Sequence, residues 1–177
     1  MEVSSPITKE LEVLIESAHK KMNELIDTIK SQILEKKDDM IQNIESKDLN
    51  FEIMSSASLL AQEKFIKTYE ILIKAIESLK KECKLISSSK ECPSKLRAPL
   101  DTFIYTAKQT NVEQLIKYAE KIKEIYGEEY ITKAENNEDN FVDENLVRYL
   151  NKKGFTFDEM KERVKLLCEE RNLKIDF

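Results

Sequence analysis

Apolar residues recur at three- and four-residue steps over the first quarter of the chain. From Ile7 to about Ser46, no glycine or proline interrupts the pattern. Such spacing places the apolar side chains along one stripe of an α-helix. At 1.5 Å per residue, a helix of about 40 residues would be about 60 Å long. The stripe consists of Ile7, Leu11, Leu14, Ile15, Ala18, Met22, Leu25, Ile26, Ile29, Ile33, Ile41 and Ile44.

A second long helix is predicted over residues 49–86, after a short polar break at residues 46–50. Because the break is short, we expect the two helices to form an antiparallel hairpin. The second helix is apolar on more than one side, since Ile71, Leu72 and Ile73 follow one another directly. We therefore expect it to be the central helix, covered by partners on more than one face.

Shorter helices follow a serine-rich loop at residues 87–93. The first of these helices includes Pro99, which is compatible with the first turn of a helix. Asn111 is predicted to be the N-cap of the second. This second helix could run past Gly127 to Ala134. Asp143 is predicted to cap a short helix, and all these elements together predict an all-α fold. These helices are predicted over residues 96–110, 112–126 and 143–150, and from Asp158 onward.

The composition argues against an enzyme. The 177 residues include 2 glycines, 1 histidine and no tryptophan. Gly127 and Gly154 are too far apart for a Walker A loop or a dinucleotide-binding loop, which need closely spaced glycines. His19 alone cannot form the histidine pair typical of zinc sites, and a histidine-based triad is disfavoured. We expect no catalytic residues, no metal and no cofactor.

Charge and cysteine content narrow the class of protein further. Charged residues make up 36% of the chain and the net charge is -5, which argues against a dedicated nucleic-acid binder. Cys83, Cys92 and Cys168 are odd in number and lack the CxxC spacing, so we expect reduced thiols in a cytoplasmic protein. The sequence also lacks an apolar run of about 18–20 residues, the length that a membrane span requires.

The last predicted helix carries an apolar stripe around one arginine. Met160, Arg163, Val164 and Leu167 loosely follow the spacing of short helices that dock into MIT domains. Any amphipathic helix that packs on a core gives the same pattern. Both interpretations therefore stay open, with a core or groove-lining helix favoured.

Short motifs in a consistent order resemble a known family. The segment Tyr126–Tyr130 reads YGEEY, and the family has YGKEY at this place. Downstream, the segment VDENL at residues 142–146, followed by Tyr149 and Leu150, is similar to a second family element. Upstream, EKFI at residues 63–66 with EIL at residues 70–72 is similar to a third. The chain thus resembles the increased sodium tolerance (Ist) family, which is ESCRT-III-like, over roughly residues 9–175.

This resemblance implies a long helical hairpin with shorter helices packed along it. It implies a non-enzymatic adaptor in multivesicular body sorting and membrane remodelling. The implied partners are an ESCRT-III subunit of the charged multivesicular body protein class and the AAA ATPase that disassembles ESCRT-III. The implied location is the cytoplasm, with recruitment to endosomal membranes and peripheral membrane association through a copolymer.

Family members capture the tail helix of their partner in a groove of the folded domain. Together with the apolar stripe, this predicts that the last helix forms one wall of the groove, through Tyr149, Met160, Arg163, Val164 and Leu167.

The resemblance also implies a basic assembly face, with Lys20, Lys21 and Lys30 at matching positions. However, 7 basic and 11 acidic residues give residues 1–48 a net charge of -4, which weighs against contacts through that face. We expect a single domain over residues 1–177, without the MIT-interacting C-terminal tail of the family. The lack of this tail weighs against direct binding of the ATPase.

Two other classes of protein stay open. A generic helical-bundle scaffold would have the same periodicity and would show no affinity for ESCRT-III tails. A membrane-surface protein is disfavoured by the low basic charge.

Overall fold

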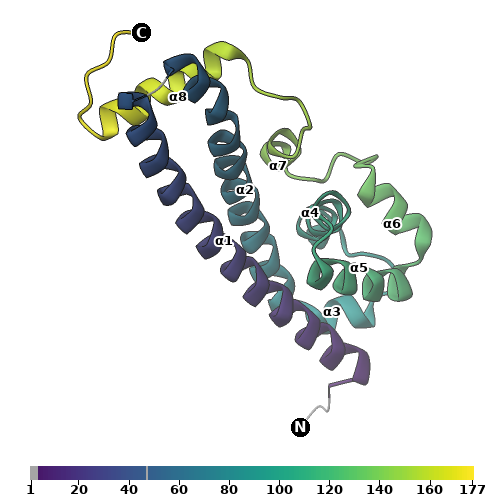
Figure 1. Cartoon of the computed structure of the whole chain (residues 1–177). Helices are drawn as coiled ribbons and strands as arrows, with labels where there is room; N and C mark the ends of the chain where they lie inside the picture. Colours follow the sequence, from purple (N-terminus) through teal and green to yellow (C-terminus); the bar gives the residue numbers. More distant parts are fainter. Residues whose placement is uncertain (1–3, 47) are drawn as a thin grey trace. The chain divides into compact units, whose positions relative to one another are not determined.

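The computed structural model describes residues 4–46 and 48–177, and every regular element within them is an α-helix (Figure 1). This confirms the all-α prediction. The chain divides into two compact units, and the long helices α1 (Pro6–Ser46) and α2 (Leu49–Lys81) each run through both. The first unit comprises the residues up to Leu25 together with Thr68–Leu150, and the second comprises Ile26–Lys67 together with Asn151–Phe177. Lys47, in the predicted break between the helices, lies outside the described residues.

Helix α1 follows the predicted apolar stripe, except that Ile7 near its start is exposed. In the first unit, Leu11, Ile15 and Ala18 are fully buried, as their three- and four-residue spacing requires. The start of α1 lies beside the end of α2, because the Lys80 ammonium is 2.5 Å from the Glu16 carboxylate. In the second unit, Gln62 of α2 donates a hydrogen bond to Gln32 of α1 over 3.2 Å. Within each unit the two helices are therefore antiparallel.

The second predicted helix is not continuous to Ile86. Helix α2 ends at Lys81, and α3 (Cys83–Ser88) follows after Glu82, whose φ of -119° and ψ of 18° interrupt the helix. Beyond this break, Cys83 and Ile86 are both buried, so the buried stripe of α2 continues into α3. No glycine or proline marks the position in the sequence.

Three helices pack together within the first unit: α4 (Ser94–Thr110), α5 (Glu113–Tyr126) and α6 (Glu128–Glu135). Phe103 of α4 and Tyr118 of α5 are both fully buried, with ring centroids 4.7 Å apart. Tilted aromatic pairs at this separation attract one another beyond their simple burial. This pair therefore fixes α4 against α5.

Three predictions in this region were wrong. Asn111 does not cap the start of α5, because its φ of 54° places it in the left-handed region, where it terminates α4. Asparagine tolerates this conformation better than most residues. Gly127 separates α5 from α6 instead of lying within one helix, since its φ is 91°. Pro99 lies in the second turn of α4 instead of the first, because the helix begins at Ser94.

The last two helices begin with side-chain caps. The Asp143 carboxylate accepts hydrogen bonds from the backbone N–H groups of Asn145 and Leu146, which confirms the predicted cap of α7 (Glu144–Tyr149). Helix α8 (Phe157–Glu170) begins one residue before the predicted Asp158. Its cap is a reciprocal pair, in which the side chains of Thr156 and Glu159 each accept from the backbone N–H of the other.

The second unit has a hydrophobic core of its own, formed by the later part of α1, the earlier part of α2, and α8. The buried members of this core are Met40, Ile44, Ile53, Leu59, Met160, Val164, Leu167 and Cys168.

Within the described residues, no helix is long and apolar enough to cross a membrane.

Candidate partner-binding site

The predicted groove residues of α8 lie in the interior of the second unit. Met160, Val164 and Leu167 belong to its hydrophobic core, and Val164 and Leu167 are fully buried. The Ser56 hydroxyl on α2 donates to the backbone carbonyl of Met160 over 3.2 Å. The apolar stripe of α8 therefore packs against the rest of the second unit.

Arg163 is engaged in an ion pair with α2. Its Nε donates to both carboxylate oxygens of Glu63 over 3.0 and 3.1 Å, and its Nη2 donates to Oε1 over 2.7 Å. The side chain of Arg163 is only 10% exposed. Burial alone would lower the pKa of Arg163, but the hydrogen bonds and charge of Glu63 raise it above its ordinary value. This guanidinium therefore stays charged and is satisfied within the chain.

Further ion pairs link the end of α8 to α1. The Glu170 carboxylate lies 3.0 Å from the Lys37 ammonium and 3.3 Å from Nη1 of Arg163. Arg171, directly after the helix, lies 2.6 Å from the Asp38 carboxylate. Burial would raise the pKa of Glu170, but the hydrogen bond from Lys37 and the charge of Arg163 hold it below its ordinary range. Helix α8 is thus attached to both long helices by charges as well as by its apolar stripe.

Tyr149 belongs to α7 of the first unit, whereas the other four predicted groove residues belong to the second. The four residues of α8 lie near one another because they share one side of this helix, which faces the core of the second unit. A role of these five residues in binding a partner stays a prediction.

The three lysines of the predicted assembly face do not share one side of α1. Lys21 and Lys30 are nine residues apart within one helix, which is two and a half turns at 3.6 residues per turn. They therefore point to opposite sides of the helix. Lys20 and Lys30 are exposed and Lys21 is half-buried, and their role in assembly stays a prediction.

The segment Tyr126–Tyr130, which carries the family resemblance, forms the junction between α5 and α6. Gly127 has a φ of 91° and a ψ of 167°, a region that is essentially restricted to glycine. The Tyr126 hydroxyl donates to the carbonyl of Ile86 over 2.9 Å, and the Tyr130 hydroxyl donates to Asp101 over 2.5 Å. Both rings therefore fix the junction to neighbouring helices.

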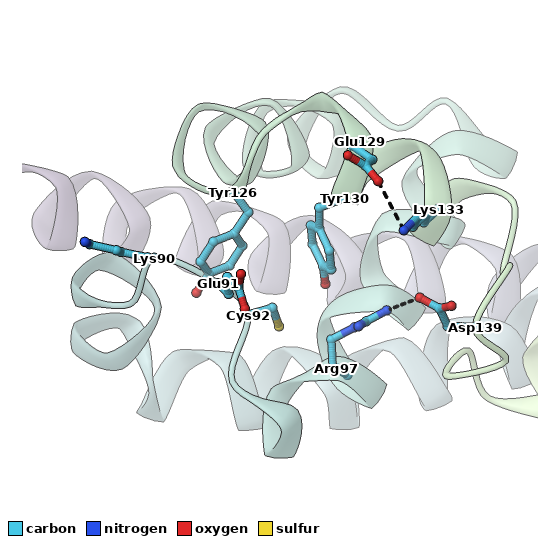
Figure 2. A pocket seen from close by; sticks show the side chains of 9 residues that line it. All are labelled: Lys90, Glu91, Cys92, Arg97, Tyr126, Glu129, Tyr130, Lys133 and Asp139. Carbon is cyan, nitrogen blue, oxygen red and sulfur yellow. Dashed lines mark hydrogen bonds and ion pairs between the residues drawn. The ribbon is translucent and has the colours of Figure 1, made fainter.

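A polar pocket of about 290 Å³ lies next to this junction (Figure 2). Arg97 of α4 donates to Asp139 over 2.7 Å and to the buried Asp101 over 3.3 Å. Its guanidinium also lies 4.5 Å from the ring centroid of Phe141, a cation–π arrangement. The Lys133 ammonium lies 3.2 Å from the Glu129 carboxylate (Figure 2). These charges pair with one another within the chain.

The polar pocket does not present an activated nucleophile. Burial raises the pKa of the Cys92 thiol, so the unreactive protonated form dominates at neutral pH. Burial is the largest cause that raises the pKa of Tyr130, and the hydrogen bond to Asp101 raises it further. Within residues 4–46 and 48–177, no group of three metal-ligating side chains is suitably placed to hold an ion.

A second hollow of about 340 Å³ lies among α4, α5 and α6, and we call it the three-helix groove. Its floor is apolar, and charged side chains stand at its rim. Sequence reasoning did not predict this groove, because it forms between three helices and the pattern within any one of them does not indicate it. The lining consists of Ile104, Ala107, Lys108, Asn111, Ile116, Ala119, Glu120, Lys123, Ile131 and Glu135.

Comparison with known proteins identifies the family. The N-terminal domain of S. cerevisiae Ist1, solved in complex with the Did2 MIM motif, superposes with a TM-score of 0.87 at 11% sequence identity. The match covers 97% of this chain and 96% of that domain, and shows a shared fold. No curated protein sequence matches the chain. A family described as Ist1, regulator of Vps4 activity in the MVB pathway, matches residues 12–174. The chain therefore belongs to the Ist1 family of regulators of Vps4 activity in the multivesicular body (MVB) pathway.

Proposed function

We propose that this protein acts by binding, without catalysis, and that it captures the amphipathic tail helix of an ESCRT-III subunit of the charged multivesicular body protein class. The observation that carries the proposal is its fold, which it shares with a domain that was crystallised with the Did2 MIM motif. A groove with an apolar floor in the first unit supports the same mode, because helix-in-groove recognition buries the apolar face of the bound helix.

The absence of catalysis is supported by the chemistry of the polar pocket. The Arg97 and Lys133 side chains are paired with carboxylates, and the Cys92 thiol is held in its protonated form. General acid–base catalysis would need a group whose pKa lies near the working pH. The side chains of this pocket instead hold α6 and the following loop in place.

Capture of the tail would affect the ATPase by competition. A tail helix that is held in a groove of this protein is not free to bind the ATPase. The fraction of tails withheld from the ATPase equals the fraction that this protein has bound. Regulation of Vps4 activity then requires no direct contact with the ATPase. Recruitment to endosomal membranes would follow from the partner.

A binding titration tests this proposal. Fluorescently labelled C-terminal peptides from a panel of ESCRT-III subunits are titrated with the full chain, and fluorescence anisotropy is measured. At least one peptide should bind saturably, and a control peptide in which the apolar anchor residues are replaced by serine should not. If none of the peptides binds the folded chain, the proposed function is wrong.

A further inference from the structure

We propose that an exposed apolar face of α2, in the second unit, pairs with the same face of a second copy of this chain to form a closed antiparallel dimer. Such a dimer is independent of the proposed function, because it needs no ESCRT-III tail. The face consists of Phe51, Met54, Ser58, Ala61 and Phe65, and we call it the outer stripe of α2.

Large apolar side chains are exposed along the outer stripe. Phe51 is 64% exposed, Met54 is 57% exposed and Phe65 is 41% exposed. The members of the stripe are three and four residues apart in alternation, which places them on one side of the helix. Ile53 and Leu59, on another side, are buried in the core of the second unit. An apolar face that stays at the surface in this way is typical of a protein–protein contact.

The charges on and around the stripe favour a second copy as its occupant. The stripe consists of apolar residues and one serine, so two copies meet without like-charge repulsion. A partner helix with charges on its contact face would lose hydration there and gain no ion pair. An anionic lipid surface would need basic residues beside the apolar ones, but residues 48–65 hold 3 acidic residues and 1 basic residue.

The order of side-chain sizes along the stripe suits an antiparallel pair. In this arrangement Met54 of one copy lies opposite Phe65 of the other, and Ser58 lies opposite Ala61. The small residues at the centre let the two helices approach closely, and a sulfur–aromatic contact closes each end. Antiparallel helices also place opposite ends of their dipoles side by side. The stripe is therefore complementary to itself.

The length of the stripe sets the strength and the size of the assembly. From Phe51 to Phe65 it is about 21 Å long at 1.5 Å per residue. This is short for a protein interface, so we expect a weak dimer with a dissociation constant in the micromolar range or above. Because both copies use the same surface, the contact closes at two copies and does not extend into a filament.

Sedimentation equilibrium of the full chain, over a range of concentrations, tests the proposal with two stripe variants. Met54→Glu and Phe65→Lys each place a charge in the stripe. Their matched controls are Val13→Glu on α1 and Phe157→Lys on α8, which make the same kind of change at exposed positions outside the stripe. Thermal melts show whether each protein is folded.

We expect the wild-type chain to pass from one copy to two as its concentration rises. Each stripe variant should weaken the dimer by about tenfold or more, and each control should change it by less than about twofold. In an equimolar mixture of Met54→Glu and Phe65→Lys, the new carboxylate of one copy lies opposite the new ammonium of the other. The mixture should therefore regain affinity, whereas a parallel pair, in which position 54 meets position 54, would not.

Several results would overturn the proposal: a wild-type chain that stays monomeric up to about 0.5 mM, an assembly that grows beyond two copies, or a dimer that the stripe variants leave unchanged. A mixture that regains no affinity would show that the antiparallel pairing is wrong. If the wild-type chain is monomeric and the stripe variants lose binding to anionic liposomes or to an ESCRT-III tail peptide, the stripe has that other occupant and the dimer is wrong.

A smaller change keeps the test decisive if either stripe variant fails to fold. Ser58→Glu places a charge at the centre of the stripe, and Ser17→Glu on α1 is its matched control, since both serines are exposed. Ser58→Glu should weaken the dimer by about tenfold or more, and equal dimerisation of the two serine variants would overturn the proposal.

Discussion

The guanidinium of Arg163 on α8 contacts both carboxylate oxygens of Glu63 on α2, with three N–O distances between 2.7 and 3.1 Å. Forked pairs of this kind are stronger and more directional than pairs formed by lysine. The pair lies beside the apolar stripe of α8 and fixes the rotation of this helix on α2. It therefore accounts for an arginine in the middle of a core-facing stripe.

Replacing Glu63 by glutamine should lower the free energy of unfolding by about 1–3 kcal/mol, because it leaves a nearly buried guanidinium facing a neutral amide. Chemical denaturation measures this change. Glu70→Gln, at an exposed position of the same helix, is the matched control and should change stability by less than about 0.5 kcal/mol. If the two variants have the same free energy of unfolding, the ion pair between Arg163 and Glu63 does not contribute to stability.

Leu166 and Leu167 give a direct comparison of the two sides of α8. Leu167 is fully buried, whereas Leu166 is 44% exposed. We expect Leu167→Ala to cost about 2–5 kcal/mol and Leu166→Ala less than about 1 kcal/mol, measured by urea denaturation. A small effect of Leu167→Ala would contradict the placement of the apolar stripe in the core and would support its role as an open groove wall.

The two glycines should respond differently to alanine. Gly127 has a backbone conformation essentially restricted to glycine, and Gly154 has no positive φ, while neither has an atom within 4 Å of an added Cβ. Gly127→Ala should therefore destabilise the fold by about 1–3 kcal/mol through backbone strain alone. Gly154→Ala should be neutral or slightly stabilising. The difference in melting temperature between the two variants checks this, and indistinguishable melting temperatures would count against the strained junction.

The hydroxyl of Tyr118 is buried and finds no hydrogen-bond partner among the described residues. A buried, unsatisfied hydroxyl costs about 1–3 kcal/mol, and here burial also raises the pKa of the phenol. Tyr118→Phe should keep the packing on Phe103 and raise the melting temperature or leave it unchanged. Destabilisation by more than about 1 kcal/mol would show that the hydroxyl has a partner, such as a buried water.

The elements that could be predicted from sequence are those that local pattern determines. The stripe from Leu11 to Ile44 specifies α1, because its period places the apolar side chains on one face of a helix and no glycine or proline interrupts it. Asp143 specifies the start of α7 through its own side-chain hydrogen bonds. The capping pair of Thr156 and Glu159 was also present in the sequence, three residues apart, and would have placed the start of α8 correctly.

The features that were missed depend on tertiary packing. The break at Glu82 has no local signal, because no glycine or proline lies there and the buried stripe continues across it from Leu79 to Cys83. The same stripe in α8 is typical of a groove wall and of a core helix, and only packing against Met40 and Leu59 decides between them. The three-helix groove arises from the arrangement of three helices, which no pattern within one helix can predict.

The central claim is that the folded chain captures the tail helix of an ESCRT-III subunit, and backbone chemical-shift mapping tests it most directly. The ¹⁵N-labelled chain is titrated with C-terminal peptides of ESCRT-III subunits, and the perturbed amides are assigned. We predict saturable shifts that are confined to one contiguous surface of the folded chain. If no peptide of the panel perturbs the amides, the claim is contradicted.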